Sequence, residues 1–195
     1  LAKHPKKLFM VLHMYGSHFN YRDRYPKADA RFLPDLPTEA KAKNRRQLLN
    51  AYDNTILETD RFLANLISML KKQGCISALL YTSDHGENIF DDSRKLFLHA
   101  SPRPSTYNTD VPLMIWTSGG YDRLYASTLT ALRRNVGKGV ESNASVFPTM
   151  LSIGGIKTKL HLDSLSLANP AYKFGTRYYL NDHNHAVPLS VYGIR

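Results

Sequence analysis

The stretch Ala78–Glu87 has the sequence ALLYTSDHGE, in which an apolar run passes directly into charged and imidazole side chains. The apolar part, Ala78–Tyr81, is short and continuous, which is typical of a strand covered on both faces. Two further runs have the same character, LFMVL at Leu8–Leu12 and VPLMIWT at Val111–Thr117. Pro112 falls near the start of the last run, where a missing N–H does least harm to a strand ladder. The three runs predict buried parallel strands.

The segment between the first two runs, about Lys43 to Lys72, predicts the strongest helix of the chain. Its apolar side chains recur at steps of three, four and seven residues and form one stripe. Gly74 is the expected stop, since glycine commonly ends a helix. A second helix is predicted at Ser145–Ile153, with Pro148 in its first turn. Together with the strands, these helices predict an α/β fold with a mainly parallel sheet sandwiched by helices.

The tail of the chain has two strand-like segments, Tyr172–Tyr179 and Val187–Tyr192. The polar residues Asn181–Asn184 lie between them and favour a turn. We therefore expect a hairpin or a pair of edge strands at this end of the chain.

The chain is basic, with 26 Lys and Arg against 16 Asp and Glu among its 195 residues, a net charge of +10. Much of the excess lies in the segment Lys3–Arg46, so this segment could face phosphate or an anionic surface. A solvated basic face without a ligand is the alternative. The single cysteine, Cys75, excludes an internal disulfide, and no run of 18 apolar residues indicates a membrane span.

Imidazole and carboxylate side chains follow the predicted strands. His13 and His18 come just after the first run, Asp84 and His85 just after the second, and His99 after a short apolar run. Parallel strands deliver the side chains at their carboxyl ends to one edge of a sheet. Aspartate and neutral histidine are good zinc ligands. Alternatively, Asp84 caps a following helix and His85 is a surface residue. The residues themselves leave open whether such a site is catalytic or structural.

Several motifs occur in an order that resembles the C-terminal half of the catalytic domain of the phosphoethanolamine transferases, in the sulfatase branch of the alkaline phosphatase superfamily. The resemblance covers roughly Leu8 to Ile156. The motifs are LHMYGSH at Leu12–His18, YP at Tyr25–Pro26, YDNTI at Tyr52–Ile56, SDHGE at Ser83–Glu87, LH at Leu98–His99 and VPLMIW at Val111–Trp116.

The resemblance implies an alkaline phosphatase-like domain that binds one or two zinc ions, ahead of calcium or manganese. Asp84 and His85 match metal ligands. Glu87 would not bind the metal itself but would orient one of its ligands. His18 and His99 match histidines that face the transferred phosphoryl group or hold a second zinc, and His13 would help to bind the substrate. The nucleophile of the family, a threonine that becomes phosphorylated, has no counterpart in these residues.

From this resemblance we expect residues 1–195 to be the C-terminal portion of a sulfatase-like domain, inactive by itself. The nucleophile-bearing half and a membrane anchor would lie upstream, with the catalytic domain in the periplasm at the bacterial inner membrane. The expected partners are a phospholipid donor, a lipid or glycan acceptor and the N-terminal half of the same protein. The expected reaction is transfer of phosphoethanolamine from the donor to the acceptor.

Two other functions remain open on the sequence. One is a sulfatase or phosphodiesterase of the same superfamily, which the upstream nucleophile would distinguish. The other is a non-catalytic basic module that binds anionic polymers, with a steep salt dependence. Nucleic acid is not an expected partner, because the basic residues lack the interleaved aromatic side chains of a recognisable module.

Overall fold

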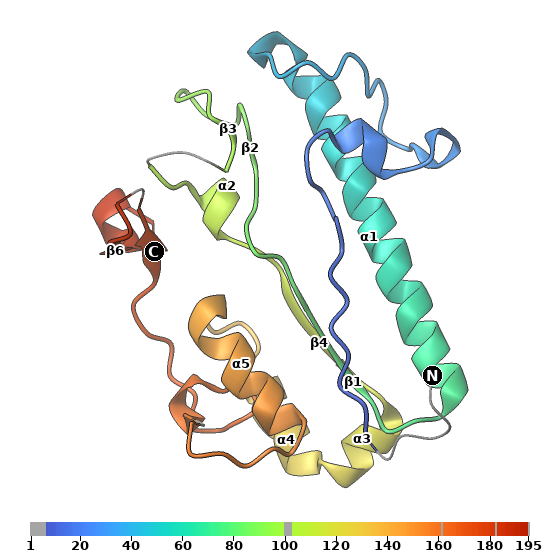
Figure 1. Ribbon diagram of the computed structural model, residues 1–195, viewed down its shortest axis with the longest axis vertical. Coiled ribbons are helices and arrows are strands. Elements are labelled where there is room, and N and C mark those ends of the chain that lie inside the picture. Colours follow the sequence, from blue (N-terminus) through green and yellow to red (C-terminus); the bar gives the residue numbers. More distant parts are fainter. Residues whose placement is uncertain (1–6, 100–102, 161, 182, 195) are drawn as a thin grey trace. The chain divides into compact units, whose positions relative to one another are not determined.

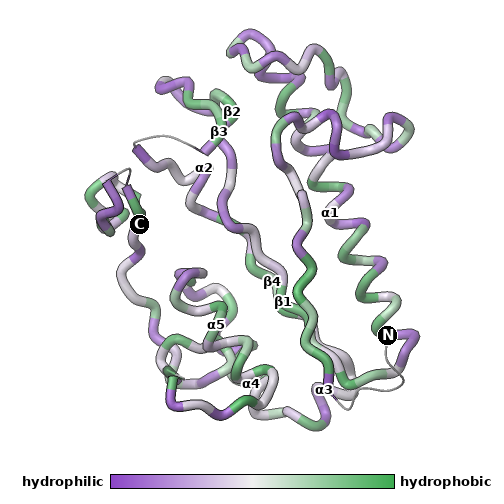
Figure 2. The backbone as a smooth tube through the Cα atoms, viewed as in Figure 1, coloured by the Kyte–Doolittle hydropathy of each residue, from purple (hydrophilic) through white to green (hydrophobic). Residues whose placement is uncertain are grey.

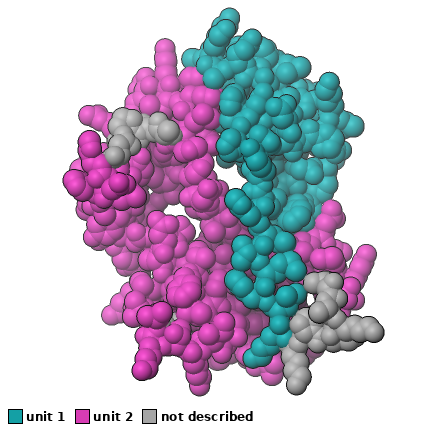
Figure 3. Space-filling view, viewed as in Figure 1, with its two compact units in different colours: residues 1–64 teal, residues 65–195 magenta. Residues whose placement is uncertain are grey.

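The computed structural model describes residues 7–99, 103–160, 162–181 and 183–194. The start of the basic segment, up to residue 6, lies outside these residues. The chain divides into two compact units, residues 1–64 and 65–195, which Figure 3 shows in different colours. Each unit is described by itself below.

The first unit is built on the long helix α1, Arg45–Gln73, whose last turns belong to the second unit. The predicted helix is therefore confirmed, and Gly74 ends it with a left-handed φ of +65°. On the helix, Leu48 and Ala51 are fully buried, and the ring of Tyr52 packs edge-on against that of Tyr21 at 5.2 Å. Three 3₁₀ turns precede the helix, η1 at Tyr21–Arg24, η2 at Lys27–Asp29 and η3 at Ala42–Asn44.

The apolar run Leu8–Leu12 does not form the expected strand. No ladder among the described residues contains it, and the exposed fractions of its five side chains lie between 49% and 75%. Figure 2 shows this run as a hydrophobic stretch of the tube. The prediction was wrong because hydrophobicity favours a strand only where a second strand supplies partners for its N–H and C=O groups.

The second unit contains the other two predicted strands, β1 at Ala78–Thr82 and β4 at Leu113–Thr117 (Figure 1). They pair in antiparallel register, with Leu80 opposite Ile115, so the expected parallel pairing is wrong. Continuous hydrophobicity reports burial on both faces of a strand and not its direction. The connection between these strands holds a hairpin and a short helix instead of a crossover helix, so the chain returns antiparallel.

Three helices follow the strands, α3 at Gly119–Leu124, α4 at Ala126–Asn135 and α5 at Ser142–Ile153. Tyr121, Ile153 and Ala168 form a buried apolar cluster, against which side chains of β1, β4 and α4 pack. Helix α5 begins three residues before its predicted start, so Pro148 lies in its interior instead of its first turn. The added first residues, Ser142, Asn143 and Ala144, are small and mostly polar, so the apolar pattern does not indicate that they are helical.

Short elements complete the second unit. The tail forms the expected hairpin, in shorter strands than predicted, because the chain coils into a 3₁₀ turn after the second strand. None of the helices in the described ranges is long and apolar enough to cross a membrane. The short elements are β2 at Asn88–Ile89, β3 at Phe97–Leu98, α2 at Thr106–Thr109, η4 at Asp163–Leu165, β5 at Tyr178–Leu180, β6 at Ala186–Pro188 and η5 at Leu189–Tyr192.

Candidate metal centre

A hairpin in the second unit brings together three side chains from the predicted site. Glu87 directly precedes β2 and His99 directly follows β3, and these two strands pair in antiparallel register. The ligand atoms of His85, Glu87 and His99 all lie within 4.8 Å of one another. Histidine nitrogens and a carboxylate oxygen at such separations form a donor set suited to zinc. The site therefore includes Glu87 itself as well as the two histidines.

The hydrogen bonds of the two histidines leave a nitrogen of each ring available to a metal. His85 Nδ1 lies 3.0 Å from the carbonyl oxygen of Gly86, and His99 Nδ1 lies 3.3 Å from Glu87 Oε1. A carbonyl or carboxylate oxygen can only accept, so Nδ1 carries the proton in each neutral ring and Nε2 keeps its lone pair. Metal-binding histidines are commonly oriented in this way. The two rings lie 3.8 Å apart between centroids, so both belong to one small region.

Asp84 lies at the edge of this group, with 85% of its side chain exposed. Its Oδ2 is 3.7 Å from His85 Nε2, close to the ~3.4 Å that separates two ligands on a tetrahedral zinc ion with bonds near 2.1 Å. Partial burial alone raises the pKa of the Asp84 carboxyl, but His85 and hydrogen bonds from neighbouring N–H and hydroxyl groups lower its pKa overall. The carboxylate is thus held in the ionised form that a metal needs. No helix follows Asp84, which excludes the helix-cap alternative.

Gly86 occupies a position that no larger residue fits. A Cβ atom there would lie 2.1 Å from the carbonyl oxygen of Tyr107 in α2. The backbone of Gly86 also donates a hydrogen bond of 3.0 Å to the carbonyl of Asn108. The reason for glycine here is the close approach of the α2 backbone between His85 and Glu87.

His18 belongs to the first unit and has the same hydrogen-bond pattern as the other two histidines. Its Nδ1 lies 2.5 Å from the carbonyl oxygen of Phe19, which leaves Nε2 unprotonated in the neutral ring. Arg24 fixes this loop from η1, because its Nε donates to the His18 carbonyl at 2.9 Å. The Arg24 guanidinium also stacks on the ring of Tyr15 at 4.0 Å. Arg24 had no predicted role, because the positions of its partners, two backbone carbonyls and the Tyr15 ring, depend on the folded loop.

The YDNTI motif holds the same loop in place from α1. The hydroxyl oxygen of buried Thr55 lies 2.6 Å from Ser17 Oγ and 2.6 Å from the carbonyl of Tyr52. Since a carbonyl can only accept, Thr55 donates to Tyr52 and the Ser17 hydroxyl donates to Thr55. Ser17 directly precedes His18, so this bond anchors the histidine loop to the helix.

Asn54, the preceding residue of the motif, is 2% exposed and uses both ends of its amide. Its Oδ1 accepts from the backbone N–H groups of Arg31 and Phe32, and its Nδ2 donates to the carbonyl of Phe32 and to the hydroxyl of Tyr25. This residue therefore fastens the loop before η3 to α1. Asn54 and Thr55 of the YDNTI motif therefore both stabilise loops of the first unit by hydrogen bonds.

His13, the other histidine of the predicted site in this unit, is exposed. It borders a hollow of about 520 Å³ between residues 11–16 and one face of α1. The wall of this hollow combines apolar side chains, such as Phe62, with the polar groups of Arg24 and Thr55. His13 is thus accessible to a small molecule that enters the hollow.

The sequence model of the Sulfatase family matches residues 1–156 of this chain. The chain belongs to the sulfatase family. The phosphoethanolamine transferase EptA of Salmonella typhimurium is 32% identical over 167 residues, which cover 83% of this chain and 30% of that protein. The relatives of this chain are thus named as transferases.

Solved structures agree with this membership. The periplasmic domain of EptC from Escherichia coli is 25% identical and superposes with a TM-score of 0.77, covering 91% of this chain and 51% of that domain. A zinc complex of the same domain superposes with a TM-score of 0.76. The integral membrane protein lipooligosaccharide phosphoethanolamine transferase A of Neisseria meningitidis is 27% identical, with a TM-score of 0.71, over 80% of this chain and 30% of that protein. The alkaline phosphatase-like α/β fold is confirmed.

The chain spans about half the length of the solved EptC domain and less than a third of the EptA relative. The family match ends at Ile156, so the tail hairpin lies beyond it. The matched part includes every residue of the predicted site.

Proposed function

We propose that this chain supplies part of the catalytic site of a zinc-dependent phosphoethanolamine transferase. The main observation in support of this proposal is the cluster of His85, Glu87 and His99, whose possible ligand atoms lie within 4.8 Å of one another. Asp84 lies directly beside this cluster. The named transferases among the relatives support the reaction class. A zinc complex among domains of the same fold supports the choice of metal.

The side chains divide into four roles in this proposal. Asp84 and His85 hold the metal, and Glu87 orients His99 through the contact with its Nδ1. When bound, zinc would lower the pKa of a hydroxyl nucleophile and polarise a phosphoryl oxygen. His18 and His99 present an Nε2 lone pair that, once protonated, donates to phosphoryl oxygens or to the leaving alkoxide. His13 contributes to substrate binding.

The nucleophile, a threonine in the proposal, lies in a part of the protein outside these 195 residues. The donor is a phospholipid carrying phosphoethanolamine, and the acceptor is a lipid or glycan of the cell envelope. We place the domain on the periplasmic side of the bacterial inner membrane, held there by an anchor outside the chain. The Neisseria relative, named as an integral membrane protein that acts on lipooligosaccharide, supports this placement.

A sulfatase or phosphodiesterase activity is the second candidate. It is favoured by the Sulfatase match itself, because that family name covers sulfate ester hydrolysis. The donor cluster serves either reaction, since sulfate and phosphate esters both transfer a tetrahedral group whose oxygens need electrostatic stabilisation. A basic module for anionic polymers is less well supported, because a buried carboxylate between two histidines adds nothing to such binding.

Zinc affinity of the 195-residue chain tests the metal site directly. Isothermal titration with zinc should show one strong site that Asp84→Ala and His85→Ala each weaken by 100-fold or more, as expected for loss of a ligand (roughly 3 kcal/mol). His183→Ala is the matched control, because it removes an exposed histidine of the tail hairpin. Equal affinity in His85→Ala and the control would reject the site.

Transfer activity separates the two candidate reactions. A protein that joins this chain to the nucleophile-bearing half should move the phosphoethanolamine group of a labelled phospholipid to an acceptor lipid. Asp84→Ala and His85→Ala should abolish that transfer while circular dichroism remains unchanged. Hydrolysis of an aryl sulfate by the same preparation, without phosphoethanolamine transfer, would favour the sulfatase instead.

A further inference from the structure

Three buried polar side chains lie behind the metal-binding cluster, and the proposed reaction uses none of them. Asn88, Ser105 and Asn108 are 2%, 1% and 6% exposed. Burial of amide and hydroxyl groups is costly unless they are hydrogen-bonded. All three have partners, and those partners are backbone groups beside the site residues or other members of the network.

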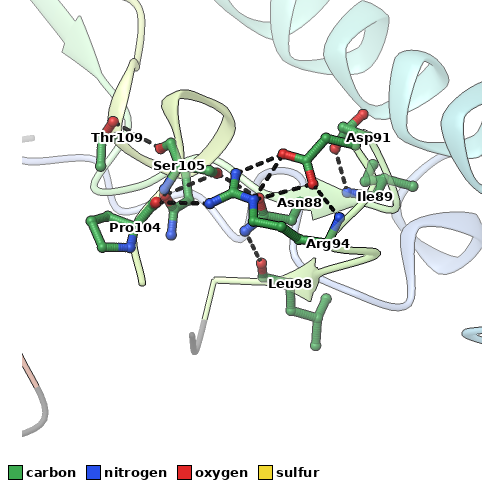
Figure 4. Close-up of polar contacts among 10 residues, drawn as sticks. Asn88, Ile89, Asp91, Arg94, Leu98, Pro104, Ser105 and Thr109 are labelled. Atoms are coloured by element: carbon green, nitrogen blue, oxygen red, sulfur yellow. Dashed lines mark hydrogen bonds and ion pairs between the residues drawn. The ribbon is translucent and has the colours of Figure 1, made fainter. Parts of the chain in front are cut away.

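Asn88 ties the two strands of the hairpin together through its side chain. Its Nδ2 donates to the carbonyl of Leu98 at 2.7 Å, the residue opposite it in the ladder. Its Oδ1 accepts from Ser105 Oγ at 2.5 Å. Figure 4 shows Asn88 between Leu98 and Ser105, with both bonds drawn. Since Glu87 precedes Asn88 and His99 follows Leu98, this bond sets the carboxylate against the imidazole.

Asn108 connects His99 to the segment that holds His85, the third residue of the cluster. Its Oδ1 accepts from the backbone N–H of Ser105 at 2.8 Å, and its Nδ2 donates to the carbonyl of His99 at 3.4 Å. Its own backbone carbonyl accepts from the N–H of Gly86 at 3.0 Å. The residue before Gly86 is His85, so one helical turn holds the backbone beside both His85 and His99.

Ser105 is the centre of this arrangement. Its hydroxyl donates its one proton to Asn88 Oδ1 at 2.5 Å. Its backbone N–H donates to Asn108 Oδ1, and its carbonyl accepts from the hydroxyl of Thr109 in α2. We propose that Ser105, Asn88 and Asn108 are positioning residues, which hold the backbone of His85, Glu87 and His99 so that His85 can bind zinc with Asp84 while His99 faces the phosphoryl group. This inference rests on the proposed function, because it presumes that the cluster binds metal.

Ser105→Ala tests the inference in the 195-residue chain. The change removes one buried hydroxyl and no ligand, yet zinc affinity should fall about 10-fold or more, the range measured for partners that orient metal ligands. The visible spectrum of the cobalt-loaded chain should also change, because the ligand separations relax. Ser105→Thr keeps the hydroxyl and should restore both readouts. The control is Ser166→Ala, which removes another fully buried hydroxyl, bonded to Ser152.

Four outcomes decide between the hypotheses. Weak zinc binding in Ser105→Ala with a normal Ser166→Ala supports the positioning role. If zinc affinity and the cobalt spectrum are unchanged in Ser105→Ala, the network stabilises the fold without positioning the metal site, and the inference is overturned. Zinc binding that is absent from the unaltered chain overturns the proposed function and this inference with it. If Ser105→Ala does not fold, Asn108→Ala carries the test, since its backbone bond to Gly86 remains, and unchanged affinity there overturns the inference.

Discussion

Gly86→Ala would place a methyl group against the backbone of α2. The added Cβ would lie 2.1 Å from the carbonyl oxygen of Tyr107, 3.2 Å from its carbonyl carbon and 3.3 Å from the Cα of Asn108. All three are main-chain atoms, so no flexible side chain can swing aside. The methyl fits only if α2 and the SDHGE loop separate by about 1.3 Å, the difference between 2.1 Å and an ordinary contact of about 3.4 Å.

The energetic cost follows from two parts. Forcing an extra methyl into a packed region costs about 1–3 kcal/mol. Separating the two segments also weakens the hydrogen bond from the Gly86 N–H to the Asn108 carbonyl, which contributes about 1 kcal/mol. We therefore expect a loss of about 2–4 kcal/mol in the free energy of unfolding, a large share of the 5–15 kcal/mol typical of a folded protein.

Urea unfolding followed by tryptophan fluorescence measures this loss, because Trp116 in β4 is the only tryptophan of the chain. Gly119→Ala is the matched control, since its Cβ would meet only Arg123 Nη1 at an ordinary 3.7 Å. That variant should unfold within about 1 kcal/mol of the unaltered chain. Zinc affinity should fall in Gly86→Ala alone. If the two alanine variants unfold at the same urea concentration, the close approach of α2 does not explain the glycine.

Three further changes test other contacts. Thr55→Val keeps the side-chain volume but removes the acceptor of the Ser17 hydroxyl, so it should cost about 1–2 kcal/mol in thermal unfolding followed by circular dichroism, while Thr55→Ser should not. Asn54→Ala should cost about 2–4 kcal/mol in the same assay, because two backbone N–H groups lose their acceptor. Burial raises the pKa of Tyr121 to about 12 from 10.0, so the stability that its neutral form supplies is complete below pH 10 and lost as pH rises through 12. Tyr121→Phe should be less stable at every pH, because it lacks the hydrogen bond to the Ile153 carbonyl. Urea titrations of this variant at pH 10 and 12 should show a smaller difference in unfolding free energy than those of the unaltered chain.

The elements with a strong local signal could be predicted from the sequence. The apolar stripe and the glycine stop placed α1 within two residues at either end, and the two interior apolar runs became β1 and β4. Strand direction and partnership could not be predicted, because they depend on residues far apart in the chain. That is why the parallel arrangement and the strand at Leu8–Leu12 were wrong.

The site could be predicted in its residue types but not in its architecture. The motif positions supplied Asp84, His85, Glu87 and His99, and the structure brings three of them within ligand distance. Whether His13 and His18 serve the same reaction stays a prediction. Asn88, Ser105 and Asn108 were missed, because asparagine and serine are polar residues whose type carries no signal for burial.

By itself, the sequence determined which side chains are candidates for metal and phosphoryl chemistry and which segments prefer helix or strand, since both depend on residue type and local spacing. Only the tertiary structure decided what holds that chemistry in place. The β2–β3 hairpin sets Glu87 against His99, and α2 lies so close to Gly86 that no side chain fits there. The physical reason is that hydrogen bonds to backbone groups and the exclusion of a single methyl are properties of distances across the fold. Those distances do not follow from residue type alone.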